Sequence, residues 1–358
     1  MINKKKINIV YLLPVSKKPS GGAKVIYEHS AIINKLQIGN FSSEIVHLKK
    51  KNNIKIINSL RNKFFHPKQQ NEYGWKTKDL CVNQKFLPSE QWINSKIVSR
   101  PDINFNKKKD FVIFPEILAH LAEDYCLKNK IKYAILVQGG YALNSSSDFD
   151  KIKKCYSNAE FILTTSFDAL KCINHIFPNI SNKVIKINLS INSKRFIYGN
   201  KKNIITYMPR KLAGDFHILK MFLNSRLSAK WKLLPIENLE EKKLNKYLCM
   251  SKIFLSFSDF EGFGLPPVEA ALAGNVVIGY TGEGGKEYWK EPIFHRIFKG
   301  DILNFSKKIL YFTNKKYNHS KWLYKTKKSR KKLLSTYSPP NEILSIKLLL
   351  NKILNLFN

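Results

Sequence analysis

The chain has 358 residues, about twice the size of a common domain, so its length predicts two domains. Apolar residues make up 44% of the composition and charged residues 25%, which is ordinary for a globular protein and excludes a disordered or fibrous chain. The net charge of +36 is extreme, yet only seven of the 62 basic residues are arginine, the residue that nucleic-acid-binding proteins favour. We therefore expect no nucleic-acid partner, and attribute to the scattered lysines a loose attraction to anionic membrane surfaces.

The five cysteines are scattered and show neither a C-x-x-C pair nor a spacing suited to zinc. An odd, scattered set of this kind is typical of reduced thiols in the cytosol. The apolar run Ile7–Leu13 is too short for the core of a signal peptide, and no run approaches the roughly 20 apolar residues that span a bilayer. The sequence thus predicts a cytoplasmic protein, with peripheral attachment to the inner face of the membrane left open.

Expected strands and helices alternate through the first half of the chain. Ile7–Leu13 is nearly all apolar, as in a strand buried on both faces, and is followed by a loop at Pro14–Ala23 and a helical pattern at Lys24–Leu36. Residues 52–100 show no regular pattern and stay unassigned. The remaining strands are expected at Glu44–Leu48, Phe111–Phe114, Tyr133–Val137, Phe161–Thr165 and Val184–Ile187, and the remaining helices at Ile117–Asn129 and Phe167–Ile176.

The alternation begins again after the polar segment Asn188–Lys202. Strands are expected at Asn203–Met208, Trp231–Ile236, Ile253–Phe257 and Val276–Tyr280, and helices at Asp215–Asn224, Leu239–Met250, Pro267–Ala273 and Glu342–Phe357. The pattern predicts an α/β protein with two doubly wound Rossmann-like domains, residues 1–195 and 196–335. Residues 336–358 form a broadly apolar C-terminal helix that docks either locally or across the first domain. In such sheets ligands bind outside the carboxyl ends of the strands.

The segment Ser258–Glu269 follows one of these expected strands. Gly262 and Gly264 allow the backbone to come close to a ligand, and the two prolines after them suit the first turn of a helix. A helix N-terminus attracts an anion such as a diphosphate. The same residues also suit a plain strand-to-helix connection in which Glu269 complements the helix dipole, so the local pattern leaves both interpretations open.

The longer stretch Glu261–Gly274, EGFGLPPVEAALAG, closely resembles the E-x7-E signature of retaining glycosyltransferases with the GT-B fold (glycosyltransferase family 4-like). The resemblance continues through Val276–Tyr280 and Gly282–Tyr288, and it covers the first half of the chain only loosely. It implies two domains facing across a cleft. It also implies transfer of a sugar, with retention of configuration, from a nucleotide-diphosphate donor to a glycan or lipid-linked acceptor. No metal and no cofactor beyond this co-substrate are implied.

The resemblance also assigns roles within the second domain. Glu261 would contact hydroxyls of the donor sugar, and Glu269 would hold the ribose of the nucleotide. Backbone amides would approach the sugar and the diphosphate at Gly262, Phe263, Gly264 and Leu265.

A basic pair in the family neutralises the diphosphate, and its counterpart here is Arg210 with Lys211, after the expected strand Asn203–Met208. The family usually separates the two charges by several residues, so Lys220 is an alternative to Lys211. An arginine fork suits phosphate oxygens. Both charges would equally suit a solvated loop.

In the first domain, Gly21 and Gly22 resemble the glycine loop that lies near the donor phosphates and the acceptor. Gln138 follows the expected strand Tyr133–Val137, at a position where many family members carry histidine near the reacting carbon. Glutamine cannot act as a general base, so Glu116 is a substitute unless it merely opens a helix. His120 is more readily structural.

Asp148 and Asp150 have the D-x-D form that holds a divalent ion in metal-dependent glycosyltransferases of another fold. Asp148 follows a serine run and fits a helix cap better, so we expect no metal site. Two other functions stay open on this sequence. One is a sugar-nucleotide epimerase or hydrolase on the same fold, and the other is a non-catalytic polyanion-binding protein.

Overall fold

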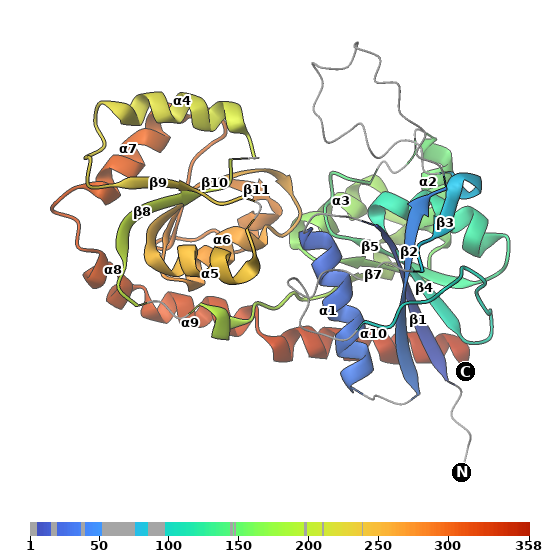
Figure 1. Cartoon of the computed structure of the whole chain (residues 1–358). Helices are drawn as coiled ribbons and strands as arrows, with labels where there is room; N and C mark the ends of the chain where they lie inside the picture. Colours follow the sequence, from blue (N-terminus) through green and yellow to red (C-terminus); the bar gives the residue numbers. More distant parts are fainter. Residues whose placement is uncertain are drawn as a thin grey trace. The chain divides into compact units, whose positions relative to one another are not determined.

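The computed structural model describes residues 6–15, 20–36, 40–51, 76–84, 97–143, 146, 148–196, 199–209, 211–237 and 239–358. The chain divides into two compact units (Figure 1). Unit 1 comprises Met1–Ile187 together with Ile343–Asn358, and unit 2 comprises Asn188–Glu342. No helix in the described ranges is both long enough and apolar enough to cross a membrane. Most of the unassigned region 52–100 lies outside the described residues.

Unit 1 is built on a seven-stranded sheet with the order β3-β2-β1-β4-β5-β6-β7. All neighbouring strands are parallel except β3, which runs antiparallel to β2 at one edge. Every residue of β4 is buried, as its apolar run predicts. The strands are β1 (Ile7–Pro14), β2 (Phe41–Lys50), β3 (Leu80–Val82), β4 (Asp110–Pro115), β5 (Lys132–Val137), β6 (Phe161–Thr164) and β7 (Val184–Lys186).

Helices cover both faces of this sheet. Helices α1 (Gly21–Leu36) and α10 (Pro339–Phe357) pack in the hydrophobic cluster on one face. Helices α2 (Phe149–Asn158) and α3 (Phe167–Ile176) belong to the cluster on the other. From α10 the apolar residues Ile346, Leu349, Leu350, Ile353 and Phe357 enter the core of unit 1.

The helical stretch expected near Ile117–Asn129 is present, but it is not a regular α-helix. A 3₁₀ turn, η3 (Glu116–Leu121), is followed by a π-helical turn, η4 (Glu123–Leu127). The wide turn is closed by the bond from Lys128 N to Glu123 O, 3.2 Å long. This mixed geometry buries Leu118, Leu121 and Cys126 in one cluster, so core packing overrides the regular helical spacing.

Unit 2 has a five-stranded, all-parallel sheet with the order β12-β11-β10-β8-β9. Helices α4 and α7 lie together on one side, and α5 and α6 on the other (Figure 1). The strands are β8 (Lys202–Tyr207), β9 (Lys232–Pro235), β10 (Ser251–Glu261), β11 (Val276–Glu283) and β12 (Phe294–Arg296). The helices are α4 (Ala213–Asn224), α5 (Glu241–Met250), α6 (Leu265–Leu272), α7 (Ile302–Thr313), α8 (His319–Lys325) and α9 (Lys327–Thr336), with a 3₁₀ turn η7 (Gly284–Glu287).

Strand β10 continues four residues beyond its expected end at Phe257. The register with β11 shifts after Ser258, and pairing resumes between Glu261 and Glu283. This bulge absorbs Asp259 and Phe260 and lets the ladder continue. Glu261 is therefore the last residue of a paired strand and not part of a loop.

Candidate active site

The strand order of unit 2 reverses between β8 and β10, since β9 lies beyond β8 and β11 lies beyond β10. Ligands of doubly wound sheets bind at such a switch point, outside the carboxyl ends of the strands. The segments that leave this point are Met208–Leu212 after β8 and Gly262–Gly264 after β10. Sequence reasoning had selected both.

An ion pair joins the first of these segments to the end of β10, directly before the second. Lys211 Nζ lies 2.6 Å from Glu261 Oε1, and the two side chains are 11% and 23% exposed. A charge-assisted hydrogen bond of this length is stronger than a neutral one. The structure thus brings together two residues that the sequence assigned to diphosphate and sugar binding.

Strained backbone flanks this ion pair. Leu212 and Phe260, the neighbours of Lys211 and Glu261, each have a φ of 44°. The left-handed region costs a residue with a side chain about 1–2 kcal/mol. Such conformations collect at ligand-binding and catalytic sites, which favours a functional role for this point of the sheet.

An aromatic cluster holds the loop between β10 and α6 in place. Tyr288 donates a hydrogen bond of 2.7 Å from its hydroxyl to the carbonyl of Gly264. The side chain of Phe263 is buried, with its ring 5.1 Å from that of Tyr288 and 4.8 Å from that of Tyr337. Phe263 therefore has only its backbone left for a ligand.

The start of α6 offers few backbone donors beyond the glycine loop. Gly264 is the N-cap, with a φ of 76° that glycine adopts readily, and Leu265 is the first helical residue. Pro266 and Pro267 lack an N–H, so only Leu265 keeps one among the first three positions. The side-chain cation of Lys211 is therefore the stronger attraction for a diphosphate. Glu269 lies one turn after Leu265 on the same face and is half-buried.

The turn after β11 supports the glycine loop directly, a feature that sequence reasoning missed. A Cβ built on Gly284 would lie 1.1 Å from the carbonyl oxygen of Gly262, so only glycine fits there. Glu283 has a φ of 65° and pairs with Lys286. The glycines at 284–285, quoted within the resemblance, were the signal for this contact.

Arg210 and Lys220 are the other two cations that the sequence analysis considered for diphosphate binding. Arg210 lies outside the described residues. Lys220 is exposed on α4 and does not take part in the Lys211–Glu261 ion pair. The contact favours Lys211 over Lys220 as the second charge.

Unit 1 has its own switch point, between β1 and β4. Gln138, after β5, donates a hydrogen bond of 3.1 Å to the carbonyl of Gly22. Glu116, after β4, accepts one of 3.1 Å from the backbone N–H of Gly139. The structure thus links the predicted residues Gly22, Gln138 and Glu116 at one edge of the sheet.

The expected loop at Pro14–Ala23 ends earlier than predicted, because α1 begins at Gly21. Ser20 starts the helix by accepting a bond from Lys24 N at 3.0 Å. Gly21 is exposed, and nothing lies within 4 Å of a Cβ added to it. Both glycines therefore belong to the first turn of a helix.

Asp148 is the N-cap of α2 and accepts a hydrogen bond of 2.9 Å from Lys151 N, which confirms its interpretation as a cap. His120 is buried within η3. Over the described ranges no three side chains of His, Cys, Asp or Glu gather as a metal-ligating group.

No family model matches the chain. The alpha-1,6-glucosyltransferase of Actinobacillus pleuropneumoniae serotype 7 (strain AP76) is 32% identical over 80 residues, which are 22% of this chain and 24% of that protein. The chain thus matches about a quarter of the length of this curated relative.

Solved structures are similar over nearly the whole chain. The sucrose-phosphate synthase from Thermosynechococcus elongatus has a TM-score of 0.65 at 11% identity and covers 98% of this chain and 100% of its own. The Anabaena protein HepE, in complex with UDP and glucose, has a TM-score of 0.61 at 10% identity and covers 98% and 99%. These likenesses confirm the predicted fold class, the two-unit α/β fold of the GT-B glycosyltransferases.

Proposed function

We propose that this protein is a glycosyltransferase that moves a sugar from a nucleoside-diphosphate donor to a glycan or lipid-linked acceptor. The observation that carries the proposal is the Lys211–Glu261 ion pair at the switch point of unit 2. It combines a cation suited to phosphate with a carboxylate suited to sugar hydroxyls. The glycine loop follows Glu261 directly, and Glu269 lies one helical turn after the first residue of α6.

A uridine nucleotide with glucose is the first donor to test. HepE, which shares the fold, was solved with UDP and glucose, and the curated relative is a glucosyltransferase. On this proposal Lys211 contacts the diphosphate and Glu269 holds the ribose. Glu261 contacts the sugar, and the amides of Gly262 and Leu265 approach the phosphates.

The proposed reaction retains configuration at the sugar carbon. The bond from C1 to the diphosphate oxygen breaks while the acceptor oxygen bonds to C1 from the same face, and the acceptor's proton passes to the departing oxygen. Lys211 stabilises the charge that develops on the diphosphate. This route needs no protein base, which agrees with the presence of glutamine at position 138 and with the predicted independence from metal.

We also propose that the protein is cytoplasmic and associates peripherally with anionic membranes, where a lipid-linked acceptor would be found. Helices α8 and α9 carry six exposed lysines, namely Lys321, Lys325, Lys327, Lys328, Lys331 and Lys332. Near an anionic surface each contributes about 1 kcal/mol. Binding to anionic liposomes should be strong at low salt and fall steeply as salt is raised.

The test is a thermal-shift screen of nucleotide sugars in EDTA, followed by determination of the product's anomeric configuration by NMR. We expect a nucleoside diphosphate and one of its sugars to raise the melting temperature. A donor that binds only with manganese would contradict metal independence. Cleavage or epimerisation of the donor without an acceptor would favour the hydrolase or epimerase. Binding of polyanions but of no nucleotide sugar would contradict the proposal.

A further inference from the structure

The chain passes between its two units twice, and the two passages are bound to each other. The first connecting segment, residues 188–201, leads from unit 1 into unit 2. The second connecting segment, residues 337–342, leads from the end of α9 into the first turn of α10. The backbone N–H of Ile191 donates to the carbonyl of Tyr337 at 3.0 Å. A hydrogen bond within unit 2 thus joins the two segments.

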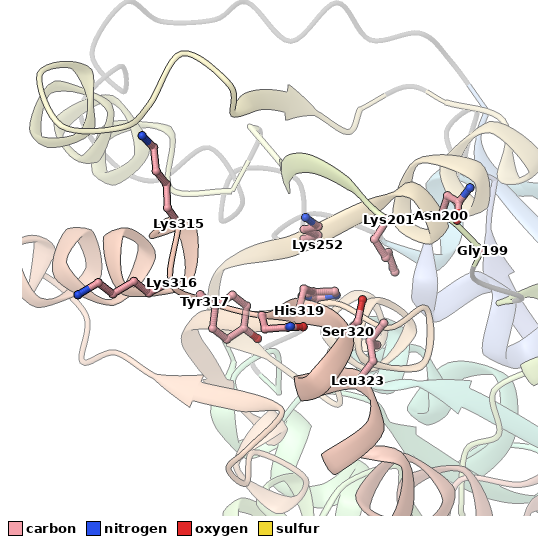
Figure 2. A pocket seen from close by; sticks show the side chains of 11 residues that line it. Gly199, Asn200, Lys201, Lys252, Lys315, Lys316, Tyr317, His319, Ser320 and Leu323 are labelled. Carbon is pink, nitrogen blue, oxygen red and sulfur yellow. The ribbon is translucent and has the colours of Figure 1, made fainter.

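The first connecting segment is held at two further points. The hydroxyl of Ser190 donates to the carboxylate of Glu342 in the second segment. At its other end, Lys201 lies in the wall of a cavity of about 570 Å³ (Figure 2). The Nζ of Lys201 donates to carbonyls at the C-termini of α5 and α6, those of Ser251, at 2.7 Å, and of Ala273. Both ends of the segment are therefore anchored within unit 2.

Tyr337 extends this link to the glycine loop of unit 2, Gly262–Gly264. Tyr337 is 7% exposed, and its ring centroid lies 4.8 Å from that of Phe263 and 6.2 Å from that of Tyr288. Its hydroxyl donates to Glu287 Oε1 at 3.1 Å. The second connecting segment thus contacts both the glycine loop and η7, the turn that supports it.

These contacts prevent the loop and the segments from moving independently. Phe263 is buried within the loop, and Tyr288 also donates to the carbonyl of Gly264. Closely packed side chains change between discrete arrangements and do not deform continuously. A shift of Tyr337 therefore requires Phe263 and Tyr288 to repack. Through the backbone of Tyr337, a change in the loop also reaches Ile191.

We propose that Tyr337 is a positioning residue that couples donor binding at the glycine loop to the conformation of the two connecting segments. The inference rests on the proposed function, because the ligand at the loop is the nucleoside diphosphate of the donor. A donor that orders the loop then orders the segments, and disorder of the segments weakens donor binding by the same factor. Couplings of this kind change affinity by about 5–150-fold.

The test measures UDP affinity by calorimetry, and amide hydrogen exchange of residues 188–196 with and without UDP. Exchange of the Ile191 amide requires its bond to Tyr337 to open, so it reports on the link directly. In the unchanged protein we expect UDP to slow this exchange by about fivefold or more, although no proposed UDP contact lies in the segment.

Two variants at position 337 divide the link into its parts. Tyr337→Phe removes only the hydroxyl, so UDP affinity should fall by about 2–10-fold and UDP should slow the exchange less. Tyr337→Leu also removes the ring packing and should abolish the effect of UDP on the exchange. If Tyr337→Leu fails to fold, Tyr337→Phe decides the question alone.

The matched control is Tyr133→Phe in unit 1. Tyr133 is buried, and its hydroxyl donates to the carbonyl of Cys155 at 2.6 Å. The control loses a buried hydroxyl of the same kind, so its melting temperature should fall about as much as that of Tyr337→Phe. Its UDP affinity and its exchange response to UDP should match those of the unchanged protein.

The coupling and the proposed function fail in different ways. Equal UDP affinities in Tyr337→Phe and the control would overturn the coupling. UDP binding that leaves exchange of the Ile191 amide unchanged in the unchanged protein would overturn it as well. A failure of the unchanged protein to bind any nucleoside diphosphate would refute the proposed function, and the coupling with it.

Discussion

Lys211 and Glu261 are fifty residues apart in the sequence, yet their charged groups lie 2.6 Å apart in unit 2. Removing either charge deprives the other of this partner. A donor that binds Lys211 through its diphosphate and Glu261 through its sugar would contact both partners of this ion pair. Variants at the two positions therefore distinguish a functional pair from a structural one.

We expect Glu261→Gln to lower turnover by roughly 10²–10³, because a charged hydrogen bond to the sugar is lost in the transition state. UDP affinity should stay the same or rise, since Lys211 is released from its carboxylate. Steady-state kinetics, UDP titration and melting temperature on the one variant give the answer. Full turnover in Glu261→Gln would remove the main support for a glycosyltransferase.

Lys211→Gln should weaken UDP binding by about 10–100-fold, the value of a charged hydrogen bond. Lys220→Gln removes the same charge from the exposed surface of α4 and should bind UDP like the unchanged protein. Calorimetric titrations of the two variants make the comparison. A loss confined to Lys220→Gln would transfer the diphosphate role to that residue.

Glu269→Gln should weaken binding of free UDP and of the whole donor by the same factor, about tenfold, because the ribose is common to both. An effect on stability alone, up to about 1 kcal/mol, would instead indicate that Glu269 only complements the helix dipole. Parallel titrations with UDP and UDP-glucose, together with urea unfolding, separate the two outcomes.

Gly284→Ala should displace the loop at Gly262, because the added methyl group would overlap a carbonyl oxygen. We expect a loss of about 1–3 kcal/mol of stability and of most donor binding. Gly214→Ala is the control, since a Cβ there meets nothing within 4 Å. It should leave stability unchanged or raise it by up to about 1 kcal/mol. Unfolding curves that coincide for the two variants would disprove the close contact.

The protein should lose stability as pH falls below about 6.5, because burial lowers the pKa of His47 to about 4 and of His319 to about 3. Below about pH 6.5 these histidines bind protons in the unfolded chain but stay neutral in the folded chain. The free energy of unfolding therefore falls as the pH is lowered. Each histidine contributes up to about 2 kcal/mol between pH 6.5 and 5. Urea unfolding of His47→Gln should show a shallower pH slope, and an unchanged slope would contradict the assignment.

The sequence predicts strands better than the contacts between them. Apolar runs such as Phe111–Phe114 leave little choice, since only a strand buried on both faces accommodates them in a short segment. The bulge after Ser258 gave no such signal, because it depends on pairing with β11. The ion pair of Lys211 with Glu261 likewise depends on the order of strands.

Helices α7, α8 and α9 were not predicted. For α7 the signal was present, since Ile302, Phe305, Ile309 and Phe312 recur at helical spacing and are buried. For α9 the composition hid the helix. Helix α9 has few apolar residues, and its core contact includes Arg330, which is buried and donates to Thr326 and to the carbonyl of Leu323. A charged residue at a core position breaks the hydrophobic period on which sequence reasoning relies. In this lysine-rich segment an apolar pattern is too sparse to reveal a helix.

The assignment of α10 to unit 1 has a consequence for synthesis on the ribosome. Unit 2 is continuous in the chain, so all of its residues emerge in one stretch. Unit 1 begins earlier but completes its core only when Ile346, Leu350 and Ile353 emerge, after the whole of unit 2. The half of the protein that is translated first is therefore the last to be able to finish folding, and until then the part of its sheet face that α10 covers beside α1 has no packing partner.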